Sequence, residues 1–162
     1  MGGLVAPLLG VRSAAAQTAE VDRPEDKAPV DAYFAYVGAR TTKERNARGN
    51  GINVYRVDAK TGVWSHVQLV DDLVNPSFLA FDRTGEFLYT IHGDLSDITS
   101  FSINGETGEL TQINRQSTEG KNPVHLAIDP SNRFVVVANH ITSTIALLTR
   151  EADGSLGPVI DL

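Results

Sequence analysis

Cysteine is absent from this chain of 162 residues, and its absence excludes disulfides, thiolate nucleophiles, iron–sulfur clusters and cysteine-based zinc sites. Basic residues are few, because 14 Lys and Arg stand against 20 Asp and Glu, for a formal charge of −6. We therefore do not expect a nucleic acid as the main partner, since phosphate binding depends on an excess of positive charge. No run of about 18 apolar residues occurs, so no membrane-spanning helix is expected.

Several motifs that carry well-defined chemistry are also missing. The sequence contains no P-loop, no Gly-x-Gly-x-x-Gly and no Gly-x-Ser-x-Gly. It also lacks a compact ligand spacing such as His-Glu-x-x-His, so His92 and His140 are not expected to bind a metal with Asp94. The sequence predicts neither a metal site nor a cofactor. What remains is an ordinary composition, 41% hydrophobic and 21% charged, which is typical of one folded domain.

The first 31 residues differ in composition from the rest. Residues 1–16 (MGGLVAPLLGVRSAAA) are small and apolar and end like a signal-peptidase site, without the basic start of a complete signal peptide. We interpret them as a truncated signal peptide, which predicts a periplasmic or secreted protein. The alternative is a flexible tail on a cytoplasmic protein. Residues 17–31 are polar and contain proline, which predicts a disordered linker before a folded domain over residues 32–162.

An internal repeat of 46–47 residues organises that domain. Gly62, Gly108 and Gly154 recur at a spacing of 46 in similar turns, and residues 75–82 match residues 122–129 at an offset of 47. Each repeat holds four short runs rich in Val, Ile, Phe and Tyr and bounded by turn residues. In the central repeat these runs are 78–82, 86–92, 98–104 and 110–116. Four short strands in about 40–50 residues are the signature of a β-propeller blade.

The sequence therefore predicts an all-β fold of propeller blades, each with four antiparallel strands. About eleven strands are expected: three of a first blade, four of a second and nearly all of a third. A closed ring needs at least about four blades. We therefore expect an incomplete propeller, a truncated product of a longer gene, whose open blade edges allow self-association.

Irregular, polar connections gather on one face of the predicted blades. The tight turns of the opposite face carry Asp, Asn and Gly in their usual hairpin places. Loops on a rigid scaffold commonly carry function. For Asn75 and Asn122 the favoured interpretation is an Asx-turn before the next strand, and for His125 packing and catalysis remain equally open. The candidate site residues are His125 as catalyst and Arg40, Asn75, His92, Lys121, Asn122 and Asn139 as substrate-binding residues.

Several short segments between residues 36 and 156 carry a family resemblance, the longest being 51–58 (GINVYRVD), 75–80 (NPSFLA) and 123–130 (PVHLAIDP). In order and spacing they are similar to the propeller lactonase family, which includes bacterial 6-phosphogluconolactonase and fungal carboxy-muconate cyclase. The resemblance implies a seven-bladed propeller, of which this chain would form about three blades. It also implies that His125 is the family's His after Pro. The chain departs from the family pattern at His92-Gly93, where the family has Asn-Glu.

These observations together predict a lactone-acting enzyme, a hydrolase of a small carboxylated or phosphorylated sugar lactone. Arg40 and Lys121 would hold the anionic group of the lactone or the related acid. His125 would act as general acid or base, since an imidazole with its ordinary pKa of about 6.5 suits neutral pH. Hydrolysis and ring closure are not separated by the sequence. The alternative is a non-catalytic periplasmic propeller that binds a small molecule or a protein on the same face.

Overall fold

The computed structural model describes residues 31–162, so the predicted signal peptide and all but the last residue of the predicted linker lie outside the described residues. The described part is built of strands and one turn of 3-10 helix, η2 (Lys43–Arg45). No helix in it is long and apolar enough to span a membrane. The strands are β1 (Ala32–Gly38), β2 (Ile52–Asp58), β3 (Trp64–Val70), β4 (Pro76–Phe81), β5 (Phe87–His92), β6 (Asp97–Ile103), β7 (Leu110–Ser117), β8 (Pro123–Ile128), β9 (Phe134–Asn139), β10 (Thr144–Arg150) and β11 (Leu156–Asp161).

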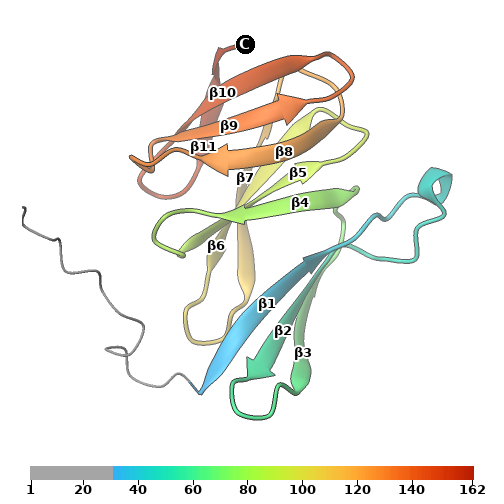
Figure 1. Cartoon of the computed structure of the whole chain (residues 1–162), viewed down its shortest axis with the longest axis vertical. Coiled ribbons are helices and arrows are strands. Elements are labelled where there is room, and N and C mark those ends of the chain that lie inside the picture. Colours follow the sequence, from blue (N-terminus) through green and yellow to red (C-terminus); the bar gives the residue numbers. More distant parts are fainter. Residues whose placement is uncertain (1–30) are drawn as a thin grey trace, which may run out of the picture.

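The strands form three antiparallel sheets, ordered β1-β2-β3, β4-β5-β6-β7 and β8-β9-β10-β11. Within each sheet, neighbours in the chain are neighbours in the sheet, as in a propeller blade. Figure 1 shows the sheets following one another from β1 in blue to β11 in red. The inner strands β4 and β8 contact each other, as do the outer strands β7 and β11. The prediction of an incomplete all-β propeller is confirmed.

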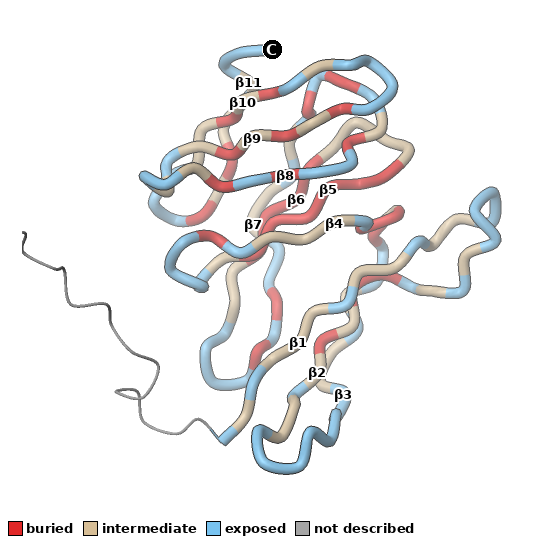
Figure 2. Tube along the Cα trace, in the orientation of Figure 1, coloured by how far each residue is buried: buried red, intermediate tan, exposed pale blue. Residues whose placement is uncertain are grey.

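Apolar side chains fill the two spaces between the sheets. Leu88 of β5 packs toward the first sheet in a cluster with Ile52 and Val54. Its neighbour Tyr89 packs toward the third sheet in a cluster that contains Val137. Since successive side chains of a strand point to opposite faces, β5 is buried on both faces. Figure 2 shows this as an almost continuous buried stretch along β5.

A repeated tyrosine contact joins adjacent sheets. The hydroxyl of Tyr36 in β1 donates a hydrogen bond to the carbonyl oxygen of Gly108, at 2.8 Å. One repeat later, the hydroxyl of Tyr89 in β5 donates to the carbonyl oxygen of Gly154, at 3.0 Å. Both glycines lie in the tight turn between the two outer strands of the following sheet. The 46-residue spacing of these glycines therefore reflects the same contact made twice.

The tyrosine contact is accompanied by a phenylalanine ring that covers the same glycine. Phe34 lies over Gly108 and Phe87 lies over Gly154, so closely that an added Cβ would be 2.2 and 2.0 Å from a ring carbon. Both glycines also have positive φ angles, 76° and 82°. We call the contact of a strand-borne Phe with the turn glycine of the next sheet the blade joint.

A Gly154→Ala substitution is expected to destabilise the chain more than the matched Gly62→Ala substitution. Gly62 has a similar φ of 72°, but no other part of the described chain comes within 4 Å of its Cβ position. Gly62→Ala should therefore lower the free energy of unfolding by only about 1–2 kcal/mol, the penalty for a side chain at a positive φ. Gly154→Ala should add about 1–3 kcal/mol because it forces Phe87 out of the joint. Urea unfolding measures the free energy of unfolding of both variants. Equal losses of stability in Gly154→Ala and Gly62→Ala would contradict a tight contact of Phe87 with Gly154.

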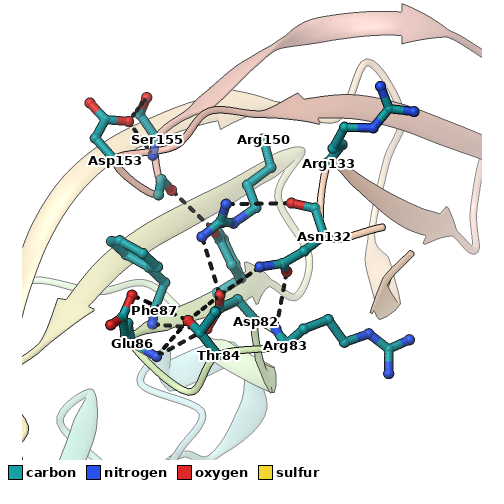
Figure 3. A network of polar contacts seen from close by, with 12 residues as sticks. Asp82, Arg83, Thr84, Glu86, Phe87, Asn132, Arg133, Arg150, Asp153 and Ser155 are labelled. Carbon is teal, nitrogen blue, oxygen red and sulfur yellow. Dashed lines mark hydrogen bonds and ion pairs between the residues drawn. The ribbon is translucent and has the colours of Figure 1, made fainter. Parts of the chain in front are cut away.

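A buried polar network fastens the third sheet to the second on the face of the tight turns (Figure 3). One carboxylate oxygen of Asp82 accepts hydrogen bonds from Arg150 Nη2 (3.2 Å), Asn132 Nδ2 (2.9 Å) and Thr84 Oγ1 (2.7 Å). Arg150 also donates from Nε to the Tyr89 hydroxyl at 3.0 Å. The Asp82 side chain is fully buried, and that of Arg150 is 8% exposed. The network is thus a shielded ion pair rather than a surface contact.

Burial alone would raise the pKa of Asp82. The hydrogen bonds from Asn132, Thr84 and backbone N–H groups outweigh that effect and lower the pKa to about 2. Asp82 is therefore ionised at neutral pH, and its charge is balanced by Arg150. Asp82 follows β4 and Arg150 ends β10, so this ion pair joins the second sheet to the third.

Candidate active site at the loop rim

Five connections lie on the face opposite the tight turns, because antiparallel strands return the chain to the same edge at every second connection. We call this face the loop rim. It consists of the β1–β2, β3–β4, β5–β6, β7–β8 and β9–β10 connections, residues 39–51, 71–75, 93–96, 118–122 and 140–143.

Asp94 is the centre of the polar contacts at the loop rim. Arg40 donates from Nη1 to its Oδ2 at 3.0 Å, and Arg45 donates from Nε to the same oxygen at 2.8 Å and from Nη2 to Oδ1. The Asp94 backbone N–H donates to Oδ1 of Asn122 at 2.9 Å. The hydrogen bonds from Arg45 lower the pKa of Asp94, and the charges of Arg45 and Arg40 act in the same direction. One carboxylate thus positions two guanidinium groups.

The side chain of Asn75 hydrogen bonds to the connections that surround Asp94. It is fully buried, with a positive φ of 45°. Its Oδ1 accepts hydrogen bonds from the backbone N–H groups of Thr41 (2.9 Å) and Thr42 (3.3 Å). Its Nδ2 donates to the Gly93 carbonyl and to Asp94 Oδ2, each at 3.2 Å. The amide therefore holds the β1–β2 loop against the β5–β6 turn. The Asx-turn favoured from the sequence is not the contact that forms, because the hydrogen bonds of the Asn75 side chain run to other connections of the rim rather than to its own strand.

A cavity of about 450 Å³ opens beside this cluster. Its volume is within the range of about 300–1,000 Å³ that is usual for small-molecule sites. Arg45 and Asp94 supply charge of both signs to its wall, and Glu44 adds a further carboxylate. The lining residues are Thr42, Glu44, Arg45, Val74, Asn75, Asp94 and Leu95.

His125 lies on the inner strand β8, where a bulge interrupts the pairing with β9 between Pro123 and His125. The same irregularity occurs in β4 between Pro76 and Phe78. Such bulges re-aim side chains at the ends of strands. The imidazole of His125 is exposed and packs on the Phe78 ring, with 4.4 Å between the ring centroids. Phe78 and His125 are equivalent positions of the repeat, now in contact across two inner strands.

Gly93 lies close to both Arg40 and the inner strand β4. A Cβ on Gly93 would lie 3.0 Å from Ser77 Oγ and 3.4 Å from Arg40 Nη1. Ser77 is the residue between Pro76 and Phe78, at the bulge of β4. The Arg40 guanidinium and the segment that carries the ring against which His125 packs therefore both border Gly93. The absence of a side chain at Gly93 leaves room for both.

Comparison with known proteins adds to this geometry. Residues 34–162 match the model of a family described as a lactonase with a seven-bladed β-propeller. This chain belongs to the seven-bladed propeller lactonase family. The family predicted from the sequence is thereby confirmed, and the three sheets described above are three blades of that architecture.

Named relatives within the lactonase family cover the same part of the chain. A 6-phosphogluconolactonase of Formosa agariphila is 31% identical over 128 residues, covering 75% of this chain and 35% of the relative. The 6-phosphogluconolactonase of Bacillus subtilis is 29% identical over 126 residues, covering 76% and 35%. The periplasmic gluconolactonase of Pseudomonas aeruginosa superposes with a TM-score of 0.70 at 26% identity, covering 80% of this chain and 38% of that structure. The chain thus spans about a third of the length of the curated relatives that it matches.

His92 is buried among the strands rather than open to the rim. Its Nδ1 lies 2.7 Å from the carbonyl oxygen of Val74, and its Nε2 lies 2.7 Å from Thr99 Oγ1. Because a carbonyl only accepts, Nδ1 carries the proton and Nε2 accepts from the Thr99 hydroxyl. Burial lowers the pKa of His92, which favours this neutral form. Both ring nitrogens are thus occupied, and the side chain has none free for a ligand.

Asn139 has a similar supporting position at the end of β9. It is 2% exposed. Its Oδ1 accepts from Thr118 Oγ1 at 2.9 Å, and its Nδ2 donates to the Thr118 carbonyl at 3.2 Å. Gly120 covers the amide so closely that a Cβ there would be 2.2 Å from Nδ2. Asn139 therefore fixes the β7–β8 connection, which carries Lys121 and Asn122.

The structure brings some of the predicted residues together and separates others. Arg40, Asn75 and Asn122 meet at Asp94, while Lys121 is exposed on the neighbouring connection. Asp94 itself was not among the predicted substrate-binding residues, although a polar residue in a short turn after a strand is a usable signal. Among residues 31–162, no group of three or more His, Asp or Glu side chains is placed to hold a metal ion.

Proposed function

We propose that this protein is a lactone-acting hydrolase whose substrate is a small carboxylated or phosphorylated sugar lactone. The observation that carries the proposal is the position of His125. His125 is an exposed imidazole at a bulge of an inner strand, which follows directly on the connection that carries Lys121, in a chain of the lactonase family. The relatives named 6-phosphogluconolactonase support the same class of substrate. The described residues supply one part of the site, since the chain spans about a third of those relatives.

In this proposal His125 transfers the proton during hydrolysis. Its imidazole accepts a proton from water as the water oxygen attacks the carbonyl carbon of the lactone. The tetrahedral intermediate collapses with cleavage of the bond between the carbonyl carbon and the ring oxygen. His125 then returns the proton to that leaving oxygen, and the hydroxy acid is released. Packing on Phe78 limits rotation of the imidazole and so keeps it oriented for both transfers.

The anionic group of the substrate is bound by the basic residues of the loop rim. Arg40 is held by Asp94 through one nitrogen, Nη1, and its guanidinium has further N–H groups to offer a carboxylate or phosphate. Lys121 adds a second cation from the β7–β8 connection. Asn75 and Asn122 act by positioning Asp94 and its loop, and we assign His92 and Asn139 to support of the rim rather than to substrate contact.

Replacing Arg40 by glutamine tests the proposed function through the Michaelis constant. We expect KM for a phosphorylated lactone to rise about tenfold or more, because a charge-assisted hydrogen bond worth about 1.5–3 kcal/mol is lost. KM for the unphosphorylated lactone should rise less, and kcat should change little. The matched control is Lys60→Gln, which removes an exposed cation from the tight turn between β2 and β3. Equal KM values for wild type and Arg40→Gln would contradict the role of Arg40.

A non-catalytic, ligand-binding propeller is the second candidate, and the surroundings of His125 favour it. No carboxylate among the described residues hydrogen bonds to His125, whereas a general base is usually oriented by a third group. Saturable binding of a sugar acid, without turnover of any lactone in a panel, would select this candidate over the hydrolase.

We propose a periplasmic or secreted location, with a cytoplasmic location as the alternative. The support is the structural likeness to a Pseudomonas aeruginosa protein described as periplasmic. The division into a leader (1–16), a linker (17–31) and one lactonase-like domain (32–162) belongs to the same proposal. Fractionation of cells that produce the protein tests the location, and N-terminal sequencing of the product tests the leader.

A further inference from the structure

Two Asn-Gly pairs occur in the chain, Asn50-Gly51 and Asn104-Gly105. In such a pair the backbone nitrogen of the glycine can attack the side-chain carbonyl carbon of the asparagine, and the glycine has no side chain to hinder the attack. This attack is the first step of spontaneous deamidation. Both asparagines are exposed. The two pairs therefore offer the same chemistry, and their folded surroundings decide which of them reacts.

The Asn104-Gly105 pair lies in the tight turn between β6 and β7, where hydrogen bonds fix its geometry. Oδ1 of Asn104 accepts from the backbone N–H groups of Glu106 at 2.9 Å and Thr107 at 3.1 Å. The carbonyl oxygen of Asn104 accepts from the Gly108 N–H at 2.7 Å. Rotation of the Asn104 side chain toward the Gly105 nitrogen therefore has to break hydrogen bonds first.

Asn50 lies at the returning end of the β1–β2 connection, which projects from the sheets as a long arm (Figure 1). Within residues 31–162 its side chain hydrogen bonds to no other residue, and neither does the backbone N–H of Gly51. The pair also lies outside η2 and β2, so no regular element encloses it. The side-chain amide of Asn50 can therefore rotate over the nitrogen that attacks it.

Glycine at position 51 is required by the fold, so the reactive pair is built into the structure. Its φ is 140°, a value that residues with a side chain rarely adopt. A Cβ at this position would lie 2.0 Å from the carbonyl oxygen of Val70. Gly105 differs, because no atom of the described chain beyond its neighbours comes within 4 Å of its Cβ position. A larger residue that would protect Asn50 is thus excluded by packing.

We propose that Asn50 is a site of spontaneous deamidation that opens the base of the β1–β2 connection. The Gly51 nitrogen forms a bond with Cγ of Asn50, the bond between Cγ and Nδ2 breaks, and ammonia leaves with the proton of the Gly51 N–H. Water then opens the resulting cyclic imide at either of its carbonyl carbons. One product is aspartate. The other is isoaspartate, in which the main chain runs through the side-chain carboxyl group and is one methylene longer.

The extra methylene falls where the two ends of the connection meet. The Ala39 N–H donates to the carbonyl oxygen of Gly51 at 3.1 Å. A Cβ on Gly49 would lie 2.2 Å from Cβ of Ala39 and 3.1 Å from the carbonyl oxygen of Arg40. Such close packing leaves no room for a longer main chain. Isoaspartate therefore breaks the Ala39–Gly51 hydrogen bond and displaces the segment that begins at Arg40.

The experiment incubates the folded protein at mildly alkaline pH and follows both asparagines by peptide mass mapping, with an isoaspartyl methyltransferase to label isoaspartate. We expect Asn50 to react about tenfold or more faster than Asn104, because two hydrogen bonds must open before Asn104 reacts. In concentrated urea, where the fold no longer distinguishes the pairs, the two rates should become equal. Equal rates in the folded protein, or a folded protein in which Asn50 stays intact, would overturn the proposal.

Asn50→Gln removes the site, because the longer side chain would have to close a larger and less favourable ring. The folded variant should carry no label, whereas the matched Asn104→Gln variant should be labelled like the wild type. Amide hydrogen exchange tests the consequence, since exchange at Ala39 should be faster in the isoaspartate form than in the unmodified protein. Unchanged exchange at Ala39 would overturn the opening of the connection. All of these readouts are independent of lactone turnover, so they stand or fall apart from the proposed function.

Discussion

Replacing His125 by alanine is expected to lower kcat for lactone hydrolysis by about 10²–10⁴-fold, the usual contribution of a general acid or base. The thermal midpoint should hardly change, because the imidazole is exposed and packs on the Phe78 ring. Initial rates on a panel of sugar lactones, measured on the protein that carries this chain, give kcat. Thermal unfolding of the same preparations gives the midpoint.

His66 provides the matched control for this substitution. It is an exposed histidine on the outer strand β3, hydrogen bonded to Asn53 at 3.1 Å and packed against Tyr55. His66→Ala should leave lactone turnover unchanged. Unaltered turnover in His125→Ala would dismiss the proton-transfer role. A fall in thermal midpoint as large as that caused by core substitutions would assign His125 to packing instead.

Replacing Arg150 by methionine is expected to destabilise the chain by about 3–5 kcal/mol. Methionine fills a similar volume but leaves the Asp82 carboxylate buried without its counter-charge. The substitution also removes the hydrogen bond to Tyr89 and the stacking of the guanidinium over Phe87, at 4.9 Å from the ring centroid. Urea unfolding at neutral pH measures the loss.

The exposed pair of Arg115 and Asp97 is the control, with a comparable N–O distance of 2.8 Å but side chains 37% and 31% exposed. Arg115→Met should cost no more than about 1 kcal/mol, because solvent screens the pair. Equal losses in the two variants would show that burial does not decide the strength of the Asp82 interaction.

The stability of the wild-type chain should also depend on pH through Asp82. Its pKa is about 2 in the fold, against an ordinary value of 3.8. Between these values the unfolded state binds more protons, so this stabilisation is present above about pH 4 and is lost as pH falls toward 2. The free energy of unfolding should fall by about 2 kcal/mol through this group. Asp82→Asn should flatten the dependence in this pH range, and an unchanged profile would contradict the lowered pKa.

The spacing of the repeat predicted most of the fold because each blade uses similar tight turns and strands of six to eight residues. The run expected at 110–116 is β7 (Leu110–Ser117), and the one expected at 86–92 is β5 (Phe87–His92). The blade joint was also present in the sequence, as Phe-x-Tyr at residues 34–36 and 87–89 with turn glycines one sheet later. That the two features contact each other follows only from the structure, because they lie in different sheets.

The arrangement of the loop rim could be predicted only in part, because its contacts are non-local. Arg40 and Arg45 reach Asp94 across 54 and 49 residues of sequence, and no local pattern specifies that pairing. The burial of His92 depends on Val74 and Thr99, which belong to two other segments. His125 was identified from its place just inside an expected inner strand and from its resemblance to the family's His after Pro, which are local features. Local signals thus located the residues, and tertiary contacts decide which of them are buried and which stay exposed at the rim.

The central claim is that His125 and the loop-rim cations Arg40 and Lys121 belong to one site for an anionic sugar lactone. The most direct measurement is a titration with 6-phosphogluconate, the acid product, followed by NMR of imidazole resonances in histidine-labelled protein. The chain has four histidines, so single His→Gln variants assign every signal. The account predicts a saturable shift of the His125 resonances, with those of His66 unmoved, and weaker binding in Arg40→Gln. Binding that leaves His125 unshifted, or that Arg40→Gln does not weaken, would contradict it.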